Sequence, residues 1–525
     1  MSAVPSAVPA ATARRPLARV AAWWPVALAV LLPLAAWAIQ GDIGLNLWDE
    51  GFLWYGAQRV LHGEVPLRDF QSYDVGRYLW SGGWLALLGS DGIVALRFGN
   101  AVLAALTGAI AARLLRDGER RSAAFTALAV VAVSLFVLLR AEGTSDAFAA
   151  VLQVGALARA LAVPGDRRRW LGAGAALGIA TAIGINHALY GTLGLALAAV
   201  HLWRRGLRRE LARGVGPVIA GVVLGYLPVL VAFLTIDGFA AAFVDSIRML
   251  FEWGTTNLEL PLVPRSPPLA ALVFVATGFW LVGISILAVA PRSALAGRPA
   301  FAAAVLMGIP YAHYATSRAD LEHVAVSVLP IVVAACTMRW RKAPRLPHLR
   351  TAVLAAVVGL AGLLVLPRQP GRWAWEGWPL EATTIRGERV RLKPWEAAEV
   401  RLVRTMAARY PAGRAFYAAP YWPGAYAVQG ARSPTWEIYA LFPSTRVRQA
   451  REQERLDAAD IAFALVSDAR VDGRSDLGFG RTHAGIVDWL DRCMARVAPP
   501  FDAAPTRGVR VLVDDGLPCD RPASP

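Results

Sequence analysis

Eleven apolar stretches, separated by short polar loops, constrain this chain more than any other feature. Each is close to the roughly 17 to 25 residues that a helix needs to cross a lipid bilayer. They lie at 21–39, 93–113, 122–139, 145–163, 170–186, 188–203, 215–235, 269–290, 299–314, 323–338 and 351–366. A chain that is 56% hydrophobic and only 18% charged has too much apolar surface for a soluble protein of this size. The sequence therefore predicts a polytopic α-helical membrane protein with about 11 transmembrane helices.

The basic residues predict how these helices are oriented. A formal net charge of +16 would suggest a nucleic-acid partner if it formed one patch, but the arginines and lysines stand in short clusters between apolar stretches. Alternate loops carry these clusters, at 14–19, 113–121, 167–169, 204–213, 292–298 and 339–350. Because basic loops stay on the cytoplasmic side, we expect a cytoplasmic N-terminus, an external C-terminus and no nucleic-acid partner.

Changes in composition divide the chain into three parts. Residues 1–20 are expected to be a disordered cytoplasmic leader, 21–366 a transmembrane domain with a first external loop at 40–92, and 367–525 an external α/β domain. The predicted strands and helices of that domain alternate: strands at 389–392, 415–418, 461–466 and 509–513, and helices at 394–409, 447–456 and 483–497. Cys493 and Cys519 could form a disulfide there if the domain faces an oxidising compartment.

An acidic pair, Asp49 and Glu50, follows the first apolar stretch directly. A carboxylate next to hydrocarbon is costly and is retained mostly for function. The alternative is that the pair caps an interfacial helix at 50–62, since acidic side chains suit a helix N-terminus.

Further ionisable residues stand at loop positions expected on the same face of the membrane. They are Asp74 and Arg77 at the end of the first loop, Asp146 before the fourth stretch, and Arg318, Asp320 and His323 before the tenth. Several helices would then direct charged groups toward one external cavity, as expected of an active site or a transport pathway. The alternatives are local ion pairs of Arg77 with Asp74 and of Arg318 with Asp320 or Glu322. His187 could likewise be a packed histidine.

Several motifs in these segments resemble one known class of enzymes. The first loop reads WDEGFLWYGAQRVLHGEVPLRDF and then YDVGRYLW, and the later motifs read SDAFAAVLQVGALARA, RADLEH and PYWPGAYAVQGARSPT. They resemble segments of bacterial membrane glycosyltransferases of the GT-C class, which includes protein O-mannosyltransferases and the aminoarabinose transferase of lipid A. The resemblance implies a GT-C-like fold in the inner (cytoplasmic) membrane. It also implies transfer of a sugar from a polyprenyl-phosphate donor to a lipid, glycan or protein acceptor on the external face.

The resemblance also implies roles for individual residues. Asp49 would be the catalytic acidic residue of the first loop, with Glu50 beside it and Asp146 facing it across the cavity. Some enzymes of this class bind a divalent cation, for which these three carboxylates would be the ligands. We expect no metal and no certain cofactor.

The residue types suit this chemistry. Transfer from a phosphate leaving group needs a carboxylate to accept the proton of the acceptor hydroxyl, and cations to hold the departing phosphate. The candidates for binding donor phosphate or substrate are Arg77, Asp74, Arg318, Asp320, His323 and His187, with Arg97 as a further candidate for the phosphate. A transporter or flippase for a lipid-linked saccharide is the alternative function, although transporters commonly contain internal repeats and none is visible here. A scaffold protein with an external binding domain would leave the acidic residues unexplained.

Overall fold

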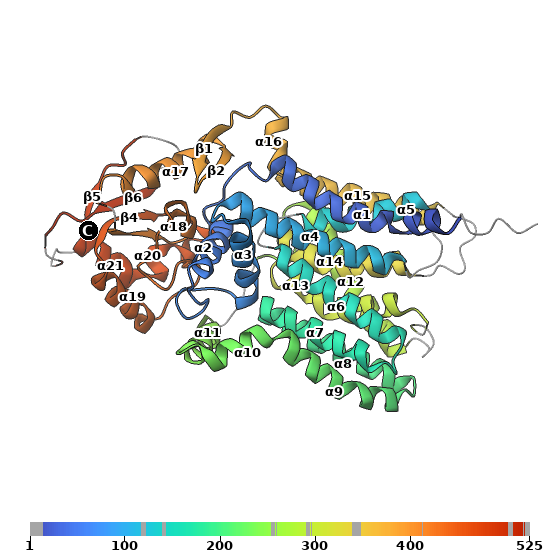
Figure 1. Cartoon of the computed structure of the whole chain (residues 1–525). Coiled ribbons are helices and arrows are strands. Elements are labelled where there is room, and N and C mark those ends of the chain that lie inside the picture. The colour runs from blue at the N-terminus through green and yellow to red at the C-terminus, as the bar shows by residue number, and fades with distance from the viewer. Residues whose placement is uncertain are drawn as a thin grey trace, which may run out of the picture.

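The computed structural model describes residues 14–116, 122–138, 143–253, 258, 260–289, 295, 297–338, 348–411, 413–501, 508–517 and 519. A bundle of long helices forms one part of the molecule, and a smaller α/β domain forms the other (Figure 1). The helices α2 (Asp49–Leu61) and α3 (Val75–Leu88) of the first loop lie between these two parts.

All the apolar stretches predicted to span the membrane are helical where the structure describes them. The bundle helices are α1 (Arg14–Gln40), α4 (Ile93–Arg116), α5 (Ala123–Val137), α6 (Thr144–Ala162), α7 (Arg167–Ile183), α8 (Ile185–Arg204), α9 (Arg208–Gly225), α10 (Leu227–Thr235), α12 (Pro267–Val289), α13 (Pro299–Ser317), α14 (Leu321–Thr337) and α15 (Leu349–Val365). Helix α1 begins at Arg14, so residues 14–20 of the predicted disordered leader are helical, while residues 1–13 lie outside the described part.

The number of spans stays a prediction. Among the described helices, six are long and apolar enough to cross a membrane, or up to seven if α9 and α10 form one span with a bend of 61°. Helices α5 and α14 are apolar but have only 15 and 17 residues. The protein is therefore a multi-pass membrane protein, and eleven crossings are more than helix length and composition establish.

Helices α7 and α9 pack through glycines at four-residue spacing. A Cβ atom at Gly174 or Gly178 would collide with backbone atoms of α9, and one at Gly221 or Gly225 would collide with backbone atoms of α7. Small residues let two membrane helices approach this closely and gain van der Waals contact, which replaces the hydrophobic effect as a driving force inside lipid.

The C-terminal domain has the predicted α/β pattern. Its four-stranded sheet has the order β3 (Ala415–Ala419), β4 (Ile461–Ser467), β6 (Val509–Val513) and β5 (Ala495–Val497), with β3 and β4 parallel and the other neighbours antiparallel. A hairpin of β1 (Glu381–Ile385) and β2 (Glu388–Leu392) stands apart from this sheet, and the main helices are α17 (Pro394–Ala407), α19 (Arg446–Ala458) and α21 (Ala484–Cys493). Strand β5 was not predicted, because residues 495–497 continue the helical pattern of 483–497. Cys493 and Cys519 form a disulfide.

The first loop and the C-terminal domain share one hydrophobic core. Phe52, Trp54 and Tyr55 of α2 are buried together with Trp422 and Tyr426 of the C-terminal domain. The hypothesis of an interfacial helix at 50–62 on the membrane surface is therefore wrong, because the C-terminal domain covers its apolar residues.

Two glycines bring the first loop and the C-terminal domain into backbone contact. A Cβ at Gly51 would lie 2.6 Å from the amide nitrogen of Gly424, which begins the short helix α18 (Pro423–Gln429) together with Pro423. The Gly424 amide also donates to the Leu47 carbonyl at 2.9 Å. The glycine of WDEG thus serves close packing.

A second contact joins the C-terminal domain to α11 (Phe239–Trp253), which lies below the first loop in Figure 1. Arg448 of α19 forms ion pairs with Asp245 at 3.0 Å and with Glu252 at 2.7 Å. The rings of Trp253 and Phe442 stack with their centroids 4.3 Å apart. These contacts hold the C-terminal domain over one end of the bundle.

Candidate functional site

Asp49 is the first residue of α2 and lies half-buried beneath the C-terminal domain. The hydroxyl of Tyr439 donates a hydrogen bond to its Oδ1 atom. The ring of Tyr439 stacks on Phe52 of α2, with centroids 5.1 Å apart. The preceding residue, Trp48, is the N-cap of α2, and its side chain makes no capping hydrogen bond. Asp49 is thus placed where the first loop meets the C-terminal domain.

Glu50 has a different environment, although it is adjacent in sequence. Arg97 of α4 donates from Nε to Oε1 and from Nη2 to Oε2, both at 2.7 Å. The same guanidinium donates to the carbonyls of Gly41 and Gly44, each at 2.8 Å. Glu50 therefore anchors α2 to α4 and to the start of the loop. Its place beside Asp49 in the catalytic centre stays a prediction.

Asp146 joins two of the predicted residues in a second centre. Its Oδ1 atom lies 3.1 Å from Nη2 of Arg77 and 3.0 Å from Nε2 of His187. The other ring nitrogen of His187, Nδ1, lies 2.9 Å from the hydroxyl of Tyr311. Because an ionised carboxylate only accepts hydrogen bonds, Nε2 of His187 is assigned the proton that it shares with Asp146. Gln153 also donates to the Tyr311 hydroxyl, at 3.1 Å.

The predicted local ion pair of Arg77 with Asp74 does not form. Arg77 pairs with Asp146, 69 positions away in sequence. Asp74 instead accepts a hydrogen bond from the backbone amide of Ile185, the first residue of α8. Burial raises the pKa of Asp74 well above its usual value, and the nearby charge of Arg77 offsets this effect only in part.

The third centre lies at the start of α14. Arg318 pairs through Nε with Asp320 at 2.5 Å, as the local alternative predicted, and Nδ1 of His323 contacts the same carboxylate at 2.7 Å. Arg318 also donates to both oxygens of Asp472, at 3.0 and 3.1 Å. Because Asp472 belongs to the C-terminal domain, Arg318 connects that domain to the bundle. Glu322 pairs with Arg368 instead of Arg318, at 3.2 Å.

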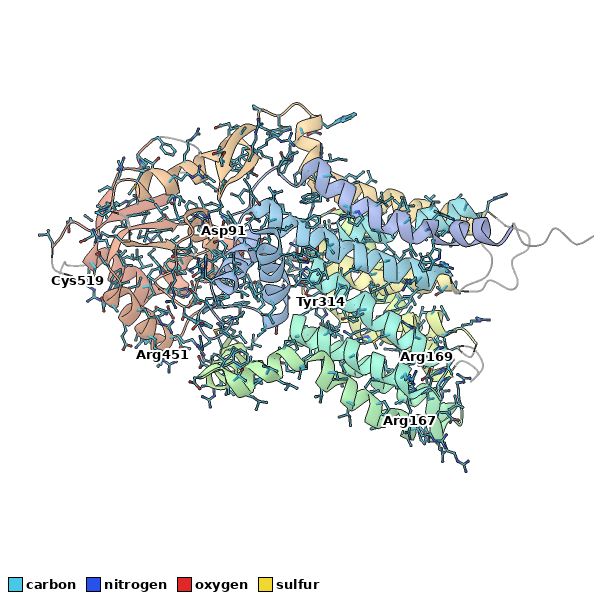
Figure 2. All side chains as sticks on the ribbon, in the orientation of Figure 1. Asp91, Arg167, Arg169, Tyr314, Arg451 and Cys519 are labelled. Carbon is cyan, nitrogen blue, oxygen red and sulfur yellow. A yellow bond between two sulfur atoms is a disulfide. The ribbon has the colours of Figure 1, made fainter. Side chains whose placement is uncertain are left out.

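Aromatic rings connect the three centres. Tyr73 lies between Arg77, whose guanidinium carbon is 5.5 Å from its ring, and Phe52, whose ring centroid is 4.9 Å away. Tyr314 lies between His187, at 6.1 Å, and His323, at 4.7 Å between ring centroids. Figure 2 shows Tyr314 at the end of the bundle that faces the first loop. The structure thus brings the predicted residues from all three segments into one contiguous region.

The three carboxylates proposed as metal ligands do not form a ligand set. Within the described residues, no three His, Cys, Asp or Glu side chains gather as a metal site would require. Arg97 holds both oxygens of Glu50, and Asp146 faces a guanidinium and an imidazole.

Sequence reasoning missed Tyr439, Asp472 and Tyr311. Tyr439 and Asp472 lie in the C-terminal domain, 390 and 154 positions from Asp49 and Arg318, the residues that they contact through the fold. Tyr311 lies inside an apolar stretch. A buried tyrosine hydroxyl needs a hydrogen-bond partner, so a tyrosine in such a stretch could have indicated a buried polar contact.

Parts of this chain resemble known glycosyltransferases in sequence and in fold. Residues 78–234 match the family model described as dolichyl-phosphate-mannose-protein mannosyltransferase, a family of the GT-C class. The fold matches the crystal structure of ArnT from Cupriavidus metallidurans bound to undecaprenyl phosphate, with a TM-score of 0.50. The resemblance to GT-C glycosyltransferases is confirmed.

The ArnT match covers 95% of this chain and 99% of that chain, at 14% identity, so the likeness to this GT-C enzyme is one of fold. The structure of the same ArnT in the apo state matches with a TM-score of 0.43 at 14% identity, over 94% of this chain and 98% of that one. The Archaeoglobus fulgidus oligosaccharyltransferase in complex with zinc and sulfate matches with a TM-score of 0.43 at 12% identity, over 93% and 73% of the two chains. No curated protein matches the sequence.

Proposed function

We propose that this protein transfers a sugar from a polyprenyl-phosphate donor to the hydroxyl group of an acceptor. The observation that carries the proposal is the position of Asp49, a half-buried carboxylate that the first loop and the C-terminal domain enclose together. The ArnT structure, which shares the fold, holds undecaprenyl phosphate. A lipid of this chemical class would supply the donor.

In the proposed step, Asp49 accepts the proton of the acceptor hydroxyl as its oxygen attacks the anomeric carbon of the sugar. A new glycosidic C–O bond forms, and the C–O bond to phosphate breaks. The electron pair of the broken bond leaves with the polyprenyl phosphate. Because phosphate is stable as an anion, its departure requires no proton donor, and one carboxylate base is sufficient.

Arg77 is the cation best suited to the departing phosphate. Its Nη2 atom is committed to Asp146, but its Nε atom is buried and has no hydrogen-bond partner in the described part of the chain. An unsatisfied buried donor is costly, and a phosphate oxygen would satisfy it with a charge-assisted hydrogen bond. In this proposal Asp146 and His187 hold Arg77 in place.

Arg318 and His323 are weaker candidates for phosphate binding. The Arg318 guanidinium already contacts two carboxylates, and His323 contacts one of these. A donor phosphate would have to displace Asp472 from Arg318. Arg318 could therefore bind the phosphate only in a conformation that differs from the present one.

The face of the membrane on which the reaction occurs also belongs to the proposal. The alternating basic loops predict that the C-terminal domain, and with it Asp49, lies outside the cytoplasm. The acceptor is then an external lipid, glycan or protein.

The centres described above lie at helix ends. Asp146 and His187 are each the third residue of their helices, and Asp320 precedes α14. A transporter or flippase commonly places its ionisable groups near the middle of the membrane. The positions therefore favour catalysis at the membrane surface over transport.

The deciding experiment incubates the purified protein with a panel of polyprenyl-phosphate sugars and measures release of the lipid phosphate in the presence of cell-envelope lipids and glycans. Release with at least one donor, lost in Asp49→Asn, would support the proposal. Release with none of them, together with movement of an intact lipid-linked sugar across vesicles, would replace it with the flippase.

A further inference from the structure

We propose that Tyr439 of the C-terminal domain is a positioning residue for the base Asp49, so that the catalytic centre is complete only when this domain is docked on the first loop. This inference rests on the proposed function. Tyr439 is 5% exposed, and its hydroxyl donates to Oδ1 of Asp49. The two residues are 390 positions apart.

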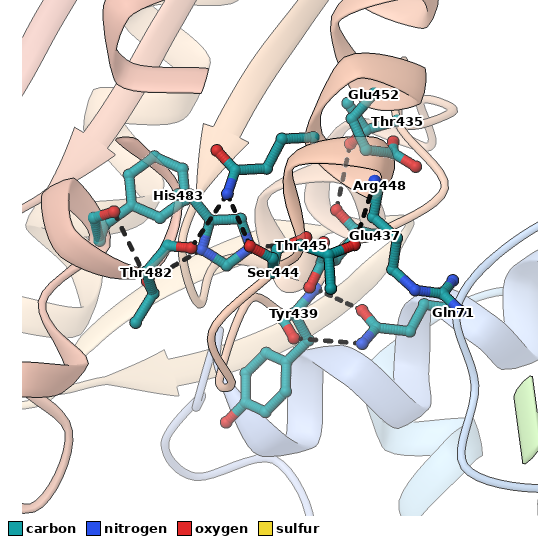
Figure 3. A network of polar contacts seen from close by, with 12 residues as sticks. Gln71, Thr435, Glu437, Tyr439, Ser444, Thr445, Arg448, Glu452, Thr482 and His483 are labelled. Carbon is teal, nitrogen blue, oxygen red and sulfur yellow. Dashed lines mark hydrogen bonds and ion pairs between the residues drawn. The ribbon is translucent and has the colours of Figure 1, made fainter. Parts of the chain in front are cut away.

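The first loop holds the backbone of Tyr439 directly. The side-chain oxygen of Gln71 accepts hydrogen bonds from the amides of Ile438 and Tyr439, at 3.0 and 2.8 Å, and its nitrogen donates to the Tyr439 carbonyl at 3.3 Å (Figure 3). The backbone amide of Gln71 donates to the carbonyl of Trp436 at 2.9 Å. The buried side chain of Gln71 thus fixes the position of the Tyr439 backbone relative to the loop that carries Asp49.

The C-terminal domain supports the same segment from the opposite side. The carboxylate of Glu452 accepts from the Trp436 amide at 2.9 Å, and His483 lies 3.3 Å from the carboxylate of Glu437. These buried groups surround the segment 436–439 in Figure 3. The position of Tyr439 is therefore determined by buried hydrogen bonds on both sides, as a residue that orients a catalytic group requires.

The hydrogen bond has one physical consequence for Asp49. It limits rotation of the carboxylate, so the acceptor hydroxyl meets the base in one orientation. The stacking of Tyr439 on Phe52 does not depend on the hydroxyl, so a phenylalanine at this position keeps the packing and loses only the hydrogen bond.

The test compares Tyr439→Phe with wild type in turnover of a polyprenyl-phosphate sugar. We expect kcat to fall about tenfold, as loss of a charge-assisted hydrogen bond of roughly 1.4 kcal/mol would cause, with the KM for the donor and the melting temperature unchanged. Tyr421→Phe is the matched control. Its hydroxyl is also buried, but it donates to the Leu477 carbonyl at 3.2 Å, and its ring touches that of Tyr439.

A wild-type kcat in Tyr439→Phe would overturn the inference, and so would a loss that Tyr421→Phe shares or that follows the amount of folded protein. These outcomes leave the proposed function intact as long as the wild type is active and Asp49→Asn is not. An inactive wild type, or an Asp49→Asn variant with the wild-type rate, would instead reject the proposed function itself.

Discussion

Arg97 donates hydrogen bonds to both oxygens of Glu50 at 2.7 Å, while the neighbouring carboxylate of Asp49 accepts a hydrogen bond from Tyr439 of the C-terminal domain. Two adjacent acidic residues at the start of one helix thus point into different environments. The pair Glu50–Arg97 is buried, with side-chain exposures of 9% and 13%. The structure separates a role in stability from the role proposed in catalysis, and this separation can be tested residue by residue.

Asp49→Asn should lower turnover by about 100-fold or more, because it keeps the size of the side chain and removes the proton acceptor. Binding of the donor lipid and thermal stability should persist. Single-turnover rates normalised to folded protein are the measurement. A near-wild-type rate would remove the assignment of Asp49 as the base.

Glu50→Gln should have the opposite profile, since it leaves the buried Arg97 without its charged partner. We expect a loss of about 3 kcal/mol in the free energy of unfolding, with activity per folded molecule largely kept. Arg97→Gln should cost a similar amount, and the double variant much less than the sum of the two. Additive losses would show that the two side chains act independently.

Asp146→Asn should leave the buried Arg77 without its hydrogen-bonded carboxylate partner and reduce the yield of folded protein. The double variant Asp146→Asn with Arg77→Gln should regain most of that stability, since the unpaired charge is gone. It should not regain donor binding if Arg77 holds the phosphate. Melting curves and binding of a polyprenyl phosphate measure the two properties separately, and a double variant with wild-type donor affinity would exclude Arg77 as a ligand.

Arg318→Ala and Asp472→Asn distinguish two roles for the third centre. If Arg318 only docks the C-terminal domain, both variants should expose the linker after α15 to protease and leave donor affinity unchanged. If Arg318 binds the donor phosphate, Arg318→Ala should weaken donor binding while Asp472→Asn preserves or strengthens it, because a competing carboxylate charge is gone.

The stability of the C-terminal domain should fall as the pH rises toward neutrality. Burial, with the charge of Glu396 as a second cause, raises the pKa of Glu399 in α17 from 4.5 to about 7. Between these values the folded state holds a proton that the unfolded state has lost, so this group's contribution is complete below pH 4.5 and declines up to pH 7. The decline is about 3 kcal/mol. Glu399→Gln should make the melting temperature less dependent on pH between pH 5 and 7.5. An unchanged dependence would contradict the raised pKa of Glu399.

The proposed orientation predicts the results of reporter fusions. Fusions at Gly165 and Gly206 should report a cytoplasmic location, since both follow helices that lead into basic loops. A fusion after Arg372 should report an external location. Because Asp49 packs against the C-terminal domain, a cytoplasmic result there would place Asp49 on the cytoplasmic face and reject the proposed orientation.

Much of the fold could be predicted from the periodicity and the residue types of the sequence. The apolar stretches predicted helices because unsatisfied backbone groups are not tolerated in lipid, and the helices are found in those places. Of the six strands in the described part of the chain, β2, β3, β4 and β6 lie where they were predicted, since a strand such as β4 is a short apolar stretch bounded by polar residues, whereas β1 and β5 were not predicted. The exact number of crossings was not determined, because helices such as α5 and α14 are near the minimum length for a span.

The sequence by itself identified most of the candidate side chains, and the tertiary structure decided what each of them contacts. The resemblance in the first loop identified Asp49 as the catalytic residue with Glu50 beside it, but it did not predict that the two side chains have different partners. Their separation follows from the rotation of 100° between successive residues of a helix, which turns Glu50 toward α4 and Asp49 toward the C-terminal domain. The partners Arg97, Tyr439 and Asp472 come from distant segments. Only packing of the bundle, loop and C-terminal domain against one another brings them within hydrogen-bonding distance.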